Sequence, residues 1–338
     1  MPATDLTSSQ RDRQNILNNR YAVDKVEQNL ALGGIQYIGD TLFTKQQVIE
    51  IFGISDSTIE KYLAQHDSEL RANGYRVLKG KYLREFKGLP DVSVISYGNK
   101  TSALGVFNFR AVLNLAMLLT ESERARIIRS RILDIVIDVM AERAGGRTKY
   151  INQRDQDYLP AAYQEFSYRQ AFAAALNNYL DMGNFKYGVY TNKVYQAIFK
   201  ENAHEYRKIL NLAEKDNLRE TLYAEVLRAV AVFESGLAEQ LKQKSEQLER
   251  KLKPKELDAL IDEAEKNPFL KPIIEDARTR MASRDLCFRD ALHEKLESYI
   301  QHVPEADFER FLGETSRSLE ERLADPETLE VFKRLKDR

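Results

Sequence analysis

The residues best suited to binding chemistry in this chain are cations gathered in one short segment. Between Arg71 and Lys87 there are six basic residues and one acidic residue, Glu85, so six minus one leaves a local charge of +5. The basic residues are Arg71, Arg76, Lys79, Lys81, Arg84 and Lys87. Clustered lysine and arginine are typical of surfaces that hold phosphate groups. The segment predicts such a surface, and its alternative role is a solvated turn whose cations only aid solubility.

The whole chain is nearly neutral. Its 338 residues include 51 Lys and Arg against 52 Asp and Glu, a net charge of −1. Acidic residues elsewhere, many of them beyond Glu256, must offset the basic segment. Neutrality therefore does not exclude a nucleic-acid partner, but it predicts that binding depends on one local face.

Composition also predicts where the protein is found. No run of about 18 apolar residues occurs, so we expect no membrane span. The polar N-terminus lacks the apolar core of a secretory signal. The single cysteine, Cys287, excludes internal disulfides and fits a reducing compartment. We expect a cytoplasmic protein without a membrane partner.

Residues for catalysis are not evident. The four histidines, His66, His204, His293 and His302, lack the spacing of metal ligands. No phosphate-binding glycine-rich loop and no nucleophile elbow is present. We predict no enzyme, catalytic residue, metal or cofactor; an enzyme acting on nucleic acid is the weakest alternative.

The element expected to position a base-reading surface runs from Thr44 to His66. Thr44 can cap one helix, Gly53 can end it, and Ser55 can cap a second helix, the spacing of a helix-turn-helix. The second helix would direct small polar groups toward base edges in the major groove. The residues assigned to DNA contact here are Thr44, Lys45, Ser55, Ser57, Thr58 and Lys61. The alternative is two packed helices of a globular domain.

A basic hairpin is expected next. Alternating runs over 75–78 and 82–86 flank Lys79-Gly80-Lys81 and predict two paired strands. Such a hairpin would serve as a DNA-binding wing whose cations contact phosphates. A second hairpin is expected with strands near 92–95 and 104–107, followed by helices over 108–119 and 121–143. The arginines at 124, 126, 129 and 131 either extend the phosphate contacts or pair with nearby acidic residues.

Residues 40–143 resemble a known group. Their order is a helix-turn-helix, a basic hairpin, a strand pair ending Val106-Phe107-Asn108-Phe109, an apolar helix, and a helix opening at 122–129. This order is similar to that of RhuM-type DNA-binding proteins, which are related to phage antirepressors of the Bro-N and KilA-N kind. The resemblance covers about 100 of 338 residues. It implies a DNA-binding regulator of a bacterium or mobile element, and also an antitoxin-like role.

For the whole chain the sequence predicts an α+β, mostly helical fold. It would have an N-terminal winged helix-turn-helix domain and an all-α C-terminal half. We expect an arm or helix over 1–34, the DNA-binding domain over 35–146, a tyrosine-rich helical domain over 147–236, and a charged helical tail over 237–338. The tail would serve oligomerisation or partner docking. Ten of the 17 tyrosines lie between Tyr150 and Tyr223, where they either pack a core or partner interface, which we favour, or stack on bases.

These patterns together predict a sequence-specific transcriptional regulator. It would bind double-stranded DNA as a homo-oligomer, a dimer or higher. The alternative is an antitoxin-like protein that binds a toxin partner and regulates its own operon.

Overall fold

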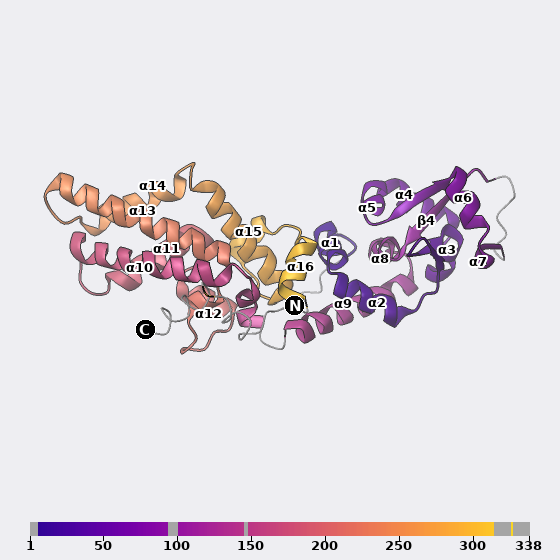
Figure 1. Ribbon diagram of the computed structural model, residues 1–338, viewed down its shortest axis with the longest axis horizontal. Helices are drawn as coiled ribbons and strands as arrows, with labels where there is room; N and C mark the ends of the chain where they lie inside the picture. The colour runs from indigo at the N-terminus through magenta and orange to yellow at the C-terminus, as the bar shows by residue number, and fades with distance from the viewer. Residues whose placement is uncertain (1–5, 94–100, 145–147, 314–325, 327–338) are drawn as a thin grey trace. The chain divides into compact units, whose positions relative to one another are not determined.

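The computed structural model describes residues 6–93, 101–144, 148–313 and 326, and it divides into two compact units. Unit 1 is Met1–Glu142 and unit 2 is Arg143–Arg338. The described residues are mostly helical, with one antiparallel sheet of four strands in unit 1 (Figure 1). The predicted mostly helical α+β class is confirmed at this level.

Unit 1 combines short helices with the sheet. Its helices are α1 (Gln10–Asn18), α2 (Arg20–Leu30), α3 (Lys45–Phe52), α4 (Asp56–Gln65), α5 (Asp67–Ala72), α6 (Gly80–Lys87), α7 (Pro90–Ser93), α8 (Phe109–Leu118) and α9 (Glu123–Ala144). Its strands are β1 (Ile35–Tyr37), β2 (Asp40–Thr44), β3 (Tyr75–Lys79) and β4 (Ala103–Asn108). The strand order is β1-β2-β4-β3 and every neighbouring pair is antiparallel.

The sheet separates two apolar cores because side chains alternate between its faces. Phe43 and Phe107 pack into the larger core with residues of α1–α4, α8 and α9. Leu42 and Val106, their neighbours in sequence, face the smaller core, which α6 covers with Leu83 and Phe86. The sheet is therefore buried on both sides, and the basic segment of the chain forms part of its cover.

The N-terminal residues belong to this unit. Leu17 and Val26, on the first two helices, are buried in the larger core. Arg13 of α1 is also buried, and its guanidinium donates to both carboxylate oxygens of Glu69 at 2.7 and 2.8 Å. The described part of the expected segment 1–34, residues 6–34, thus packs on the predicted DNA-binding domain.

The predicted basic hairpin is wrong in its second half. The first strand forms as β3, but 80–87 is the helix α6, whose first residue, Gly80, has a left-handed backbone (φ +53°). Leu83 and Phe86 are three residues apart, so a helix buries both against the sheet, whereas a strand would direct them to opposite faces. The strand that pairs with β3 is β4.

The second expected hairpin is also corrected. Val92 lies in the short helix α7, and the remaining residues of the expected first strand, 94 and 95, lie outside the described residues. Its second strand forms as β4, between β2 and β3. The helices expected over 108–119 and 121–143 are confirmed as α8 and α9.

The described part of unit 2 consists of helices and their connections, with one isolated β-bridge between Leu180 and Leu252. Its elements are η1 (Thr148–Arg154), α10 (Tyr158–Tyr179), α11 (Lys186–Phe199), α12 (Ala203–Ile209), η2 (Leu218–Thr221), α13 (Ala224–Leu248), α14 (Pro254–Lys266), α15 (Lys271–Phe288), η3 (Glu294–Tyr299) and α16 (Glu305–Leu312). The long helices α10 and α13 run side by side (Figure 1). Helix α13 continues through residue 236, where a domain boundary was expected.

Tyrosines form part of the core of unit 2. Tyr190, Tyr195, Tyr206 and Tyr223 are buried, and Tyr206 packs against Phe199. Of the two roles expected for the tyrosine-rich segment, these four positions fit the packing role. Their rings are not available to stack on bases.

Candidate nucleic-acid interface

Helix α3 and helix α4 meet at a turn that local residues fix. Thr44 and Gln47 form a capping box at the start of α3: the Thr44 hydroxyl accepts from the Gln47 amide, and the Gln47 side chain accepts from the Thr44 amide. Gly53 ends α3 in the left-handed conformation (φ +60°) that favours glycine. Thr44, assigned to DNA contact from the sequence, is fully buried and therefore supports the turn from inside.

Contacts from the start of α9 hold this pair of helices in place. The Ser122 hydroxyl donates to the carbonyl of Phe52, and Arg124 donates to the carbonyl of Glu50 at 2.7 Å. These carbonyls belong to the last turn of α3, where carbonyl groups have no hydrogen-bond donors within their own helix. Sequence reasoning missed this support because more than 70 residues separate Arg124 from Glu50 along the chain.

Helix α4 has its own anchor. The Tyr62 hydroxyl donates to Glu121 at 2.6 Å, and Lys61 approaches the same carboxylate at 3.1 Å. The Tyr62 hydrogen bond is the largest influence on this carboxyl and, with Lys61, lowers the pKa of Glu121 to about 2. The anchor leaves Ser57 and Lys61, both assigned to DNA contact from the sequence, on the exposed face of α4 together with Glu60.

Three hydroxyl groups cluster at the N-terminus of α4. The Ser55 side chain caps the helix by accepting from the Thr58 amide at 3.1 Å. Its oxygen lies 2.8 Å from the Ser57 hydroxyl and 2.9 Å from the Thr58 hydroxyl. Ser55 and Ser57 are exposed and Thr58 is half-buried. Hydroxyl groups both donate and accept, so this cluster can match either kind of polar group on a base edge.

The lysines beside this cluster are neutralised. Lys45 contacts Asp56 at 2.8 Å and Glu60 at 2.6 Å. Partial burial would lower the pKa of Lys45, but these two carboxylates outweigh burial and raise it. Lys61 is paired with Glu121 in the same way. Although α3 and α4 carry predicted contact residues, their cations add little positive field.

The basic segment after α5 divides into paired and unpaired cations. Arg71 binds Asp67, Arg76 lies 3.4 Å from Asp40, and Lys81 lies 3.6 Å from Glu85. Lys87 is half-buried and donates to the carbonyl of Thr101.

Two cations of this segment differ from the rest. Lys79 ends β3 and Arg84 lies on α6, and both side chains are exposed. Neither forms an ion pair or side-chain hydrogen bond with the residues that the structure describes. They are the strongest candidates in this segment for binding an external anion.

Three of the four arginines expected on α9 make polar contacts within unit 1. Arg126 pairs with Glu123, as the second alternative predicted. Arg124 and Arg129 instead donate to backbone carbonyls, those of Glu50 and Ala116. For these three side chains the polar contacts are internal, so they do not form a free phosphate track.

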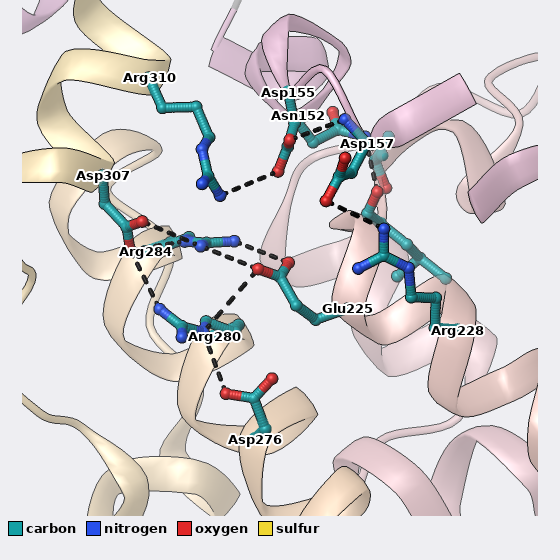
Figure 2. Close-up of polar contacts among 12 residues, drawn as sticks. Asn152, Asp155, Asp157, Glu225, Arg228, Asp276, Arg280, Arg284, Asp307 and Arg310 are labelled. Carbon is teal, nitrogen blue, oxygen red and sulfur yellow. Dashed lines mark hydrogen bonds and ion pairs between the residues drawn. The ribbon is translucent and has the colours of Figure 1, made fainter. Parts of the chain in front are cut away.

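Unit 2 also holds many charged side chains, and four of its arginines, Arg219, Arg278, Arg284 and Arg289, are buried. Arg284 is 1% exposed and donates to both oxygens of Glu225 and of Asp307 (Figure 2). Arg280 joins Asp307 to Asp276 in the same network. Burial would raise the pKa of Glu225, but Arg284 outweighs burial and lowers it.

A second buried cluster surrounds His293. One ring nitrogen, Nδ1, lies 2.8 Å from Glu201, and the other, Nε2, lies 2.7 Å from Asp285. Burial would lower the pKa of His293, but its hydrogen bonds to the two carboxylates outweigh burial and raise it to about 9. Arg289 neutralises the remaining negative charge at Asp285. No spacing in the sequence indicated this cluster, because Glu201 lies 92 residues from His293.

Among the described residues, no group of three or more His, Cys, Asp or Glu side chains is placed so that it could hold a metal ion. No helix among them has the length and apolar character to cross a membrane. Comparison of the chain with protein-family models, with curated proteins and with solved structures finds no match.

Proposed function

We propose that unit 1 is a winged helix-turn-helix module through which this protein binds double-stranded DNA as a transcriptional regulator. The observation that carries the proposal is a turn-linked helix pair, α3 and α4, followed by strand β3 and helix α6, which carry the unpaired cations Lys79 and Arg84. Helix α4 is the recognition helix and enters the major groove with Ser55, Ser57 and Thr58. The resemblance of 40–143 to RhuM-type proteins points the same way.

Strand order supports this proposal. Strand β2 precedes the helix pair, and β3 and β4 follow it and pair with each other. The last strand, β4, lies in the middle of the three, which is the order β2-β4-β3 found in winged helix-turn-helix domains. The wing of this module is β3, the connection bearing α6, and β4, in place of the simple basic hairpin expected from the sequence.

The contacts divide between the two parts of the module. Hydroxyls of α4 read base edges, while Lys79 and Arg84 contact phosphates and fix the position of the protein. Lys45 and Lys61 contribute less to affinity than their number suggests, because each is already held by carboxylates. Helix-turn-helix modules commonly read paired half-sites, so we also propose a homodimer, which mass measurements with and without DNA would test.

Binding of the full chain to duplex DNA over a salt series tests the proposal. A duplex of about 30 base pairs selected from a random pool serves as the probe. Affinity falls as salt rises, so a plot of log affinity against log salt has a negative slope. Replacing Lys79 and Arg84 with alanine should make this slope shallower by about 2, because two fewer phosphates are neutralised. Lys242→Ala, an exposed cation on α13, is the matched control and should leave the slope unchanged.

Sequence reading is tested separately. Ser57→Ala combined with Thr58→Ala should reduce the preference for the selected duplex over a scrambled one, while salt-dependent binding to both persists. Absence of duplex binding by the full chain would refute the proposed function. If the double variant prefers the selected duplex over the scrambled one as strongly as the wild type does, the hydroxyls of α4 do not contribute to base recognition.

A further inference from the structure

Two large apolar side chains are exposed on neighbouring elements of unit 1. Ile38, at the β1–β2 turn, is 72% exposed, and Tyr82, on α6, is 59% exposed. The hydroxyl of Tyr37, beside Ile38, lies 3.2 Å from the Glu85 carboxylate and 3.3 Å from the carbonyl of Tyr82, and its ring packs edge-on against Phe86. The β1–β2 turn is therefore attached directly to α6.

The backbone at Ile38 is unfavourable for its residue type. Ile38 has φ +50°, in the left-handed region, and Gly39 follows with φ +80°. Two-residue turns of this kind favour asparagine or glycine, because a β-branched residue is strained there. The fold gains neither burial nor a relaxed turn from this isoleucine, which indicates that its side chain serves a contact outside the chain.

Charge indicates which partner fits. Lys81 and Arg84 lie on the same helix as Tyr82, and Lys79 immediately precedes that helix. Lys79 and Arg84 lack ion pairs within the described part of the chain. Apolar side chains bordered by cations match a DNA minor groove, where base steps accept apolar wedges and phosphates line both edges.

We propose that Ile38 and Tyr82 form a wedge that enters the minor groove beside the site read by α4 and bends the duplex. This inference rests on the proposed function and adds a second DNA-contacting surface to it. Apolar side chains inserted at a base step unstack it and kink the helix axis. The bend brings the flanking phosphates toward Lys79 and Arg84, whose contacts offset the cost of unstacking.

The test measures bending and affinity together. The selected duplex carries a donor and an acceptor dye at its ends, and energy transfer reports the end-to-end distance when the full chain binds. Tyr82→Ala should abolish the bend and weaken binding about tenfold, while Tyr82→Phe, which keeps the ring, should retain both. Phe185→Ala removes a comparably exposed ring from unit 2 and should change neither quantity.

Ile38→Asn is the most discriminating variant. Asparagine tolerates the left-handed backbone, so the melting temperature of unit 1 should rise while DNA bending falls. A variant that is more stable and bends DNA less cannot be explained by misfolding. Tyr82→Ala also leaves the Tyr37 hydrogen bond intact, because that bond is made to the backbone carbonyl.

The outcomes separate this inference from the proposed function. If the wild-type chain binds the duplex without bending it, or the variants bend it equally, the wedge is refuted and the proposed function stands. If the wild-type chain binds no duplex, the proposed function fails and the wedge with it. If Tyr82→Ala impairs binding to a single-stranded oligonucleotide more than to the duplex, the surface stacks on unpaired bases and the wedge is refuted.

Discussion

Two arginines, Arg284 of unit 2 and Arg84 of unit 1, occupy opposite settings. Arg284 of unit 2 is buried and held by two carboxylates, whereas Arg84 of unit 1 is exposed and forms no ion pair within the described residues. The composition counts both equally, which is why the net charge of −1 says little about partners. Only a cation that is both exposed and unneutralised can attract an anion, and Lys79 and Arg84 in the basic segment of unit 1 meet that condition.

The largest expected effect lies in the buried network. Arg284→Met should lower the free energy of unfolding of unit 2 by about 3–5 kcal/mol, because Glu225 and Asp307 would be left buried without their shared partner. Urea denaturation of the full chain followed by circular dichroism measures the change. Arg228→Met breaks an exposed pair with Asp157 and serves as control, with an expected loss of about 1 kcal/mol or less. Equal losses in the two variants would contradict the distinction between buried and surface cations.

The next effect is a pH dependence confined to the buried histidine. Below the unfolded-state pKa of about 6.5, both the folded and unfolded states hold the proton and the stabilisation is complete. As the pH rises toward 9, the folded state keeps the proton that the unfolded state loses, so stability falls. The loss should be on the order of 3 kcal/mol and complete above the folded-state pKa of about 9.

Unfolding measured at about pH 6 and above about pH 9 checks this dependence. His293→Gln should flatten that part of the profile, whereas the exposed His204→Gln should preserve it. A wild-type profile as flat as that of His293→Gln would show that the imidazole does not carry a proton between Glu201 and Asp285.

Local signals explain why part of this organisation was predictable from sequence. Thr44, Gly53 and Ser55 act through neighbours within a few residues, so their caps predict α3 and α4 correctly. The segment 82–86 is ambiguous, because it alternates like a strand while Leu83 and Phe86 have helical spacing. Whether 82–86 forms a strand or a helix depends on β4. Because β4 already pairs with β3, the segment forms α6 and covers the sheet.

Contacts between distant residues could not be predicted in this way. The hydrogen bonds from Ser122 and Arg124 to α3, and those from His293 to Glu201, join residues separated by 70 or more positions. A single sequence carries no periodic pattern for such pairs. The candidate interface was therefore recognised by its local caps and its cations, whereas the ion pairs that neutralise Lys45 and Lys61 became evident only in three dimensions.

A smaller effect is expected at the helix caps that stabilise the α3–α4 pair of unit 1. Thr44→Ala should lower the free energy of unfolding of unit 1 by about 1–2 kcal/mol, since it removes a buried capping box. Ser55→Ala, at the exposed cap of α4, should cost less because water can satisfy the freed amide. Urea denaturation of both variants, followed by circular dichroism, compares the two losses in free energy of unfolding. A larger loss for Ser55→Ala would show that the cap of α4 contributes more to stability than the cap of α3.

The smallest expected effect completes the comparison. Arg84→Ala should change the free energy of unfolding by no more than about 0.5 kcal/mol, because the side chain is exposed and contributes no ion pair within the described residues. Denaturation of this variant beside Arg284→Met tests two arginines of equal charge under one condition. A loss above about 1 kcal/mol would give Arg84 a structural role and weaken its assignment to phosphate contact. A near-zero change joined to a reduced salt dependence of DNA binding would separate its binding role from folding, which is the difference expected between the cations of the two units.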